Sequence, residues 1–255
     1  MINHRVIPCL LLSNGGLVKT RKFKSAVYIG DPVNAIRIFN EKEVDELVLL
    51  DIRASLDKRG PNFELLQEIA SECFMPLAYG GGITTIEQIR SLLRLGIEKV
   101  IINTALNRDP RFIKEATAKF GSQAITASID VRRRLFGSHE VITLAGTQAT
   151  GQDPLQAALS AEELGVGEIL LTSIDAEGSM DGYDVELIAK VSQSVSIPVI
   201  ASGGAGKLED FRFSIREGHA SAVSAGSMFV FYGPHRAVLI SYPKYRIFDD
   251  LFTKT

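Results

Sequence analysis

Two glycine-rich stretches at a fixed spacing constrain this chain more than any other feature of its sequence. The first is MPLAYGGGI at residues 75–83, and the second is IPVIASGGAGK at residues 197–207. Each is typical of a buried strand that runs into a tight turn, where glycine adopts backbone conformations that other residues avoid. At an offset of 122 residues, four glycine or proline pairs coincide: Pro76 with Pro198, Gly81 with Gly203, Gly82 with Gly204, and Gly96 with Gly218. The sequence therefore predicts two copies of one structural half, at about residues 1–122 and 123–255.

Apolar strands alternate with amphipathic helices along the whole chain, without a linker. Besides the two glycine-rich strands, predicted strands lie at residues 5–12, 46–52, 98–103, 124–130, 168–174 and 221–225. Such continuous apolar runs are typical of parallel strands covered on both faces. Eight strands alternating with helices indicate a (β/α)8 barrel, although an open doubly wound sheet would also alternate. The repeat favours closure, because two four-strand halves form a ring without edges. We expect one α/β domain, a TIM barrel, over residues 1–255.

Local signals refine this prediction. Residues 13–24 are glycine-containing and basic, and we expect a loop there. Pro61 is expected to start a helix, where its missing N–H matters least. Thr84 and Glu87 match a capping box for the following helix. Residues 134–146 alternate polar and apolar side chains around a Gly-Ser pair, which predicts a hairpin inserted on the loop side.

Composition and charge exclude several classes of protein. The 255 residues carry a formal net charge of −2, which gives no electrostatic footprint for nucleic acid. No apolar run approaches the ~20 residues of a membrane helix, and the amino terminus, MINHR, lacks a signal peptide's apolar segment. Two cysteines, Cys9 and Cys73, suit a reducing compartment, so we expect a cytoplasmic protein. The four histidines show no ligand spacing, and we expect neither a metal nor a cofactor.

Polar residues gather where the predicted strands end, which is the active-site face of a barrel. Backbone N–H groups and small donors there would form two anion cradles on opposite half-barrels. One cradle combines Gly81 and Gly82 with Asn103 and Thr104, and the other combines Gly203 and Gly204 with Gly226 and Ser227. Alternatively, the glycines only close tight strand-to-helix turns. Two equivalent pairs favour a substrate that carries two phosphates.

Further strand-end residues complete the candidate substrate site: Asp51, Thr172 and Ser202. Asp130 ends the fifth strand and is our candidate general acid or base, the alternative being a solvated carboxylate. Lys19 would clamp an anionic substrate, or it is simply an exposed loop lysine. Glu177 or the N–H of Gly178, which follow the sixth strand, would contact the ligand.

Charged residues of both signs begin four strands at the opposite end of the predicted barrel. They are Arg5, Glu46, Lys99 and Glu168. Residues at strand starts are often only solvated, but two cations and two anions around one axis predict a salt-bridged floor.

These residues closely resemble HisF, the cyclase subunit of imidazole glycerol phosphate synthase. The matching stretches span residues 5 to about 230: RVIPCL, DELVLLDI, YGGGI, EKVIINTA, FGSQA, GEILLTSID, GYD and IASGGAGK. The resemblance implies a HisH-like glutaminase docked at the amino-terminal face and ammonia passing through the barrel. It also implies that the four charged residues of the floor act as an ammonia gate. The family's substrate carries two phosphates, and its reaction adds ammonia, cleaves a formimino-linked nucleotide and closes an imidazole ring.

One departure from the family pattern concerns catalysis. The family has a catalytic aspartate where this chain has Leu11, whereas its partner is retained as Asp130. Loss of a general acid or base typically costs about 10²–10⁴ in rate. Basic residues in the first loop, Arg53, and the tail after Tyr232 also depart from the pattern.

Three functions therefore stay open. The chain is the cyclase subunit with another acid in place of the lost one, or a HisF-like paralogue of surface-polysaccharide gene clusters. The paralogue would supply ammonia for amidine formation on a sugar, with a glutaminase and a separate sugar amidotransferase. The third function is a scaffold that activates the glutaminase without chemistry of its own. Leu11 and the altered tail favour the paralogue, while Asp130 and the glycine loops favour the cyclase.

Overall fold

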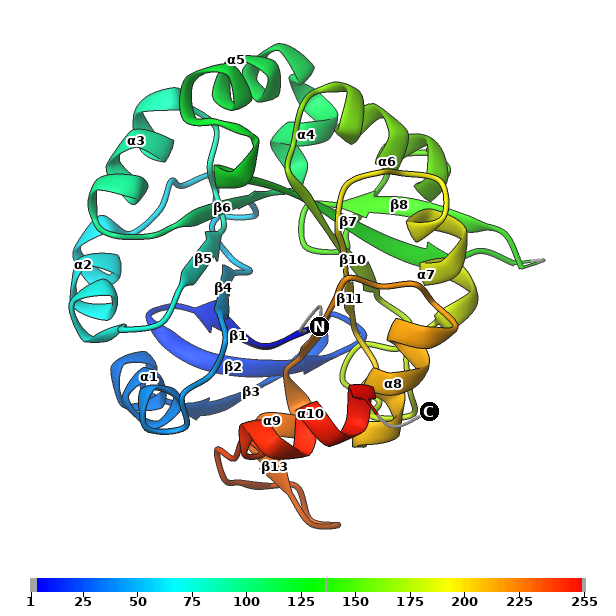
Figure 1. Cartoon of the computed structure of the whole chain (residues 1–255). Helices are drawn as coiled ribbons and strands as arrows, with labels where there is room; N and C mark the ends of the chain where they lie inside the picture. The colour runs from blue at the N-terminus through cyan, green and yellow to red at the C-terminus, as the bar shows by residue number, and fades with distance from the viewer. Residues whose placement is uncertain (1–3, 136, 254–255) are drawn as a thin grey trace.

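The computed structural model describes residues 4–135 and 137–253 and shows a closed barrel of eight parallel strands (Figure 1). Each barrel strand pairs with the next, β7 pairs with β10, and β12 closes the ring on β1. The strands are β1 (Arg5–Ser13), β4 (Leu47–Asp51), β5 (Leu77–Gly80), β6 (Lys99–Ile102), β7 (Ile125–Arg133), β10 (Glu168–Ser173), β11 (Val199–Ser202) and β12 (Ala222–Ala225). The predicted barrel is confirmed. The division into halves near residue 122 stays a prediction.

Helices form a ring outside the barrel (Figure 1). They are α1 (Pro32–Glu41), α2 (Phe63–Glu72), α3 (Ile86–Arg94), α4 (Thr104–Arg108), α5 (Pro110–Phe120), a 3₁₀ turn (Ser122–Ala124), α6 (Pro154–Glu163), α7 (Val185–Ser192), α8 (Leu208–Arg216), α9 (Ser227–Val230) and α10 (Tyr245–Thr253). None of the helices in the described ranges has the length and apolarity needed to cross a lipid bilayer.

Two predicted helix starts are displaced. α2 begins at Phe63 because the side chain of Asn62, and not the geometry of Pro61, caps it by accepting a hydrogen bond from Leu65 N. The capping box of α3 lies one residue later than predicted. The Thr85 hydroxyl accepts from Gln88 N at 3.2 Å, and the Gln88 side chain accepts from Thr85 N at 3.1 Å.

Two hairpins rise from the carboxyl ends of the barrel strands. The first consists of β2 (Gly16–Arg21) and β3 (Lys24–Gly30), so the prediction of a loop at residues 13–24 is wrong. Residues 16–21 form a strand because Leu17 and Val18 bury their side chains while pairing with β1. The second hairpin pairs β7 with β8 (His139–Thr143), followed by β9 (Gln148–Ala149), as the pattern at residues 134–146 predicts, with residue 136 outside the described part.

The tail folds back against the outer helix layer, where Phe248 of α10 packs on Phe211 of α8. It forms a small hairpin, β13 (Phe231–Tyr232) with β14 (Ala237–Val238), and then α10. Tyr242 lies in the connection and donates from its hydroxyl to the carbonyl of Val6, at 2.7 Å. Its ring also packs against Phe229 and Phe248, with centroids 5.1 and 5.2 Å away. The tail is therefore anchored to β1 and to the helix layer.

Candidate active site

A cavity of about 970 Å³ opens at the carboxyl ends of the barrel strands. All fifteen residues predicted for substrate binding and acid–base chemistry line this one cavity: Lys19, Asp51, Gly81, Gly82, Asn103, Thr104, Asp130, Thr172, Glu177, Gly178, Ser202, Gly203, Gly204, Gly226 and Ser227. Closure of the barrel brings them together from the ends of β4, β5, β6, β7, β10, β11 and β12 and from the β2–β3 hairpin. Their individual roles stay predictions.

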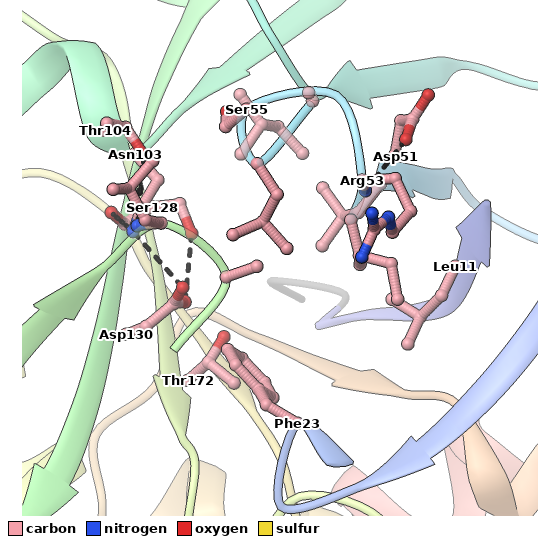
Figure 2. Close-up of a pocket in the computed structure, with 18 of the residues that line it drawn as sticks. Leu11, Phe23, Asp51, Arg53, Ser55, Asn103, Thr104, Ser128, Asp130 and Thr172 are labelled. Carbon is pink, nitrogen blue, oxygen red and sulfur yellow. Dashed lines mark hydrogen bonds between the residues drawn. The ribbon is translucent and has the colours of Figure 1, made fainter. Parts of the chain in front are cut away.

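Asp130 lies on β7 and points into the cavity from one wall (Figure 2). Asn103 donates to one of its oxygens at 3.2 Å, and the Ser128 hydroxyl donates to the other at 3.3 Å. Burial raises the pKa of this carboxyl to about 7, against the opposing effect of hydrogen bonds from Ser128 and Thr172. A group that gains or releases its proton near neutral pH suits acid–base catalysis.

The wall opposite Asp130 combines a buried leucine with an ion-paired aspartate. Figure 2 shows Leu11, Asp51 and Arg53 together on that side. Leu11 is buried, with 7% of its surface exposed, and packs with other apolar side chains of the barrel lumen. Asp51 is fully engaged, because it accepts from the N–H groups of Arg53 and Ala54 at 3.0 and 3.1 Å and pairs with Arg59 at 2.9 Å. Asp51 therefore organises the loop after β4.

Lys19 is a buried residue of β2, so the exposed loop lysine considered from the sequence is ruled out. Only 3% of its surface is exposed, and its Nζ lies 3.8 Å from Oε1 of Glu177. The hydroxyl of Thr20 donates to the same carboxylate at 2.9 Å. A Cβ at Gly226 would lie 1.9 Å from Lys19 Nζ, so glycine at this position makes room for the ammonium group. The cation is thus fixed beside the second predicted cradle.

The paired glycines have a structural role of their own. Gly82 and Gly204 have φ angles of +69° and +120°, which only glycine adopts without strain. A Cβ at Gly82 would lie 2.3 Å from the carbonyl oxygen of Arg59, and one at Gly204 would lie 2.0 Å from that of Gly182. The glycines therefore let neighbouring loops pack tightly, whether or not a phosphate binds.

Ser227 lies at the second predicted cradle. Its hydroxyl is buried and, among the described residues, has no hydrogen-bond partner. A buried hydroxyl without a partner costs about 1–3 kcal/mol.

Sequence reasoning missed Ser128 and Phe23, which also line the cavity. Ser128 precedes Asp130 by two positions on one strand, so strand alternation is a signal that could have placed both on the same face. Phe23 comes from the β2–β3 turn, and its ring lies 2.8 Å from the position where Gly146 would carry a Cβ. No sequence signal predicts this contact between the β2–β3 turn and the β8–β9 turn, both of which contribute residues to the cavity lining.

The predicted salt-bridged floor is present at the opposite end of the lumen. Arg5 forms ion pairs with both Glu46 and Glu168. Lys99 Nζ lies 2.9 Å from Glu46 and 3.1 Å from Glu168, so the two cations and two anions alternate around the axis. Between floor and cavity the lumen is lined by apolar side chains, including Ile7, Val48, Ala78, Leu170 and Ile200.

Within residues 4–135 and 137–253 no three His, Cys, Asp or Glu side chains are placed to hold a metal ion. The lining of the cavity offers carboxyl, hydroxyl, amide and cationic side chains.

Comparison with known proteins identifies relatives over nearly the whole chain. The model of the histidine biosynthesis protein family matches residues 5–235. A Pseudomonas aeruginosa protein named "Putative imidazole glycerol phosphate synthase subunit hisF2" is 54% identical over 243 residues, which are 95% of this chain and 97% of that protein. A Leptospira interrogans protein named "Putative imidazole glycerol phosphate synthase subunit HisF" is 45% identical over 253 residues, 99% of this chain and 100% of its own.

Proposed function

Because this chain belongs to the histidine biosynthesis protein family, we propose that it is the HisF-like synthase subunit of a glutamine amidotransferase complex. In this complex a HisH-like glutaminase releases ammonia at the amino-terminal face of the barrel. The ammonia passes through the lumen and reacts with a phosphorylated acceptor in the cavity. The observation that carries this proposal is the lumen itself, which runs from the ion-paired floor to a cavity that contains a buried carboxyl.

The floor and the lumen suit the passage of neutral ammonia. Arg5, Glu46, Lys99 and Glu168 neutralise one another, so together they present no net charge. The apolar layer above them disfavours ammonium strongly, because an unpaired ion loses its hydration there, whereas neutral ammonia loses little. A small movement of Lys99 or Arg5 would open the floor, which makes these four residues the gate.

Asp130 and the two cradles would carry the chemistry at the other end. Backbone N–H groups near Gly82 and Gly204, with Lys19 and Ser227, would hold two phosphates of the acceptor. Asp130 would take a proton from the attacking ammonia and return it to the leaving group. This arrangement corresponds to the reaction of imidazole glycerol phosphate synthase, in which ammonia addition, nucleotide cleavage and ring closure follow one another.

A second candidate acceptor follows from Leu11. A leucine neither donates nor accepts a proton, so one of the two carboxyls used by the cyclase is missing from the wall opposite Asp130. Amidine formation needs fewer proton transfers than ring closure. This wall therefore favours a paralogue that supplies ammonia for an amidine on a surface-polysaccharide sugar, together with a sugar amidotransferase.

One assay separates the two acceptors. Purified protein is mixed with the formimino nucleotide of histidine synthesis and an ammonium salt, and consumption is followed by absorbance, with Leu11→Asp beside it. Turnover by the unmodified chain establishes the cyclase. Turnover by Leu11→Asp alone favours the paralogue. If neither variant reacts with any acceptor, yet the chain still activates a HisH-like glutaminase, the proposed chemistry is wrong and the chain is a scaffold.

A further inference from the structure

The charge of the cavity is unequally distributed over its walls. Six cationic side chains line it, against four carboxyls. The carboxyl of Asp130 lies on one wall, while Arg53 lies on the wall of Leu11 (Figure 2). Lys58 comes from the same loop as Arg53, and Lys24 reaches the cavity from β3. Three of the six cations, Arg53, Lys58 and Arg59, therefore come from the single loop that follows β4.

The loop at residues 52–60 holds its cations in a fixed arrangement. Backbone hydrogen bonds join Asp57 N to the Arg53 carbonyl and Arg59 N to the Ala54 carbonyl, both at 2.9 Å. The guanidinium of Arg53 is oriented by Asp57, at 2.6 Å from Nη2 and 3.4 Å from Nε. A guanidinium that is already oriented loses less side-chain entropy when it binds an oxyanion.

Part of this cationic group is available to a ligand. Asp51 and Asp57 balance the charges of Arg53 and Arg59, but neither pairs with Lys58. Within the described residues, no hydrogen-bond acceptor of the protein is in range of Nη1 of Arg53 or Nζ of Lys58. Both side chains line the cavity, so an anion bound there would meet donor groups that no protein acceptor occupies.

Leu11 determines whether this wall accepts an anion. An aspartate at position 11 would place a negative charge on the wall that carries Arg53. It would repel an incoming carboxylate or phosphate and compete for the guanidinium. Leucine carries no charge, so it neither repels an anion nor competes for the guanidinium of Arg53.

We propose that Leu11, Arg53 and Lys58 form a third anion subsite, separate from the two glycine cradles, that selects an acceptor with an additional carboxylate or phosphate group. The identity of this ligand as an ammonia acceptor rests on the proposed function, whereas anion binding itself needs neither ammonia nor a glutaminase. Arg53 and Lys58 contact the anion, and Leu11 acts as a specificity-determining residue by its lack of charge.

The test is a titration of ¹⁵N-labelled protein with inorganic phosphate and, separately, with acetate, followed by amide and guanidinium NMR signals. The Nε–H of Arg53 and the amide of Lys58 report on the new subsite, while the amides of Gly82 and Gly204 report on the cradles. We expect a saturable shift at Arg53 and Lys58 with at least one of the two anions, with an affinity different from that at the glycines. The tighter anion identifies the chemical group. Saturation with neither anion overturns the proposal.

Variants isolate the roles of the residues. Arg53→Gln, read at the Lys58 amide, is expected to weaken binding about three- to tenfold, as for a half-exposed charge. Arg246→Gln removes the same charge from an exposed position on α10 and should change nothing. Leu11→Asp should weaken the subsite several-fold more than Leu11→Asn, which has similar size and polarity but no charge. Equal affinities in the two position-11 variants would refute the role of Leu11, and an unchanged affinity in Arg53→Gln would refute the subsite.

Discussion

Replacing Asp130 with asparagine is expected to stabilise the protein while strongly lowering its activity. The folded protein holds the pKa of Asp130 at about 7, compared with an ordinary value of 3.8. Because this pKa is raised, the contribution to stability is fully present below about pH 4 and is lost as the pH rises through 7. The unfolded chain ionises first, and the folded carboxyl resists ionisation because it is buried.

The size of the effect follows from the two pKa values. Each pKa unit corresponds to about 1.4 kcal/mol, so a shift of roughly three units destabilises the folded state by about 4 kcal/mol at pH 8. At pH 5 the penalty is about 1.5 kcal/mol, because that pH is only slightly more than one unit above the pKa of the unfolded carboxyl. The asparagine of the variant carries no such penalty. Its altered hydrogen bonds to Ser128 and Asn103 add an offset that does not depend on pH.

The assay is equilibrium urea unfolding of Asp130→Asn and the unmodified protein at pH 5 and pH 8. We expect the difference in unfolding free energy between the two proteins to grow by about 2–3 kcal/mol in favour of the variant over this range. Asp181→Asn, at an exposed carboxyl, controls for the change in net charge. If the difference in unfolding free energy between the two proteins is the same at pH 5 and pH 8, the carboxyl of Asp130 is not desolvated in the folded state. Ammonia-dependent turnover should fall about 10²–10⁴-fold in the variant. Full activity would refute its catalytic role.

Three further perturbations test the gate, the glycine turns and the tail. Lys99→Ala should alter glutamine-dependent turnover more than turnover with added ammonium salt, because only the former uses the floor; equal effects would contradict a gate. Gly204→Ala should lower the unfolding free energy by more than about 3 kcal/mol, because the positive φ strains alanine and its Cβ clashes with backbone. Gly151 also has a positive φ but is surrounded by open space, so Gly151→Ala should lower it by only about 1 kcal/mol. Similar losses at both glycines in urea unfolding would show that packing at position 204 is unimportant. Tyr242→Phe should cost about 1 kcal/mol by removing the hydrogen bond to the Val6 carbonyl, and unchanged stability in the same urea assay would mean that the tail is held by ring packing alone.

The barrel itself could be predicted from the sequence because its signals are local and periodic. Apolar strands, capped helices and glycine turns each occupy a few consecutive residues, and their alternation admits few architectures. The order of strands then places every strand end at one mouth, which is why the predicted polar residues share one cavity. The charged floor followed from the same reasoning, because Arg5, Glu46, Lys99 and Glu168 all stand at strand starts.

The chemistry of particular residues was decided by contacts between distant parts of the chain. Lys19 is buried because β2 pairs with β1 and Gly226 leaves space for its ammonium group, 207 positions along the chain. Asp51 is engaged locally by Arg59, eight positions away, whereas Asp130 has no cationic partner among the described residues and is instead hydrogen-bonded by Asn103 and Thr172, which the closed barrel brings beside it. Sequence patterns record which side chains share a face of one element. Desolvation and pairing depend on which elements meet in space, and only the tertiary structure fixes them.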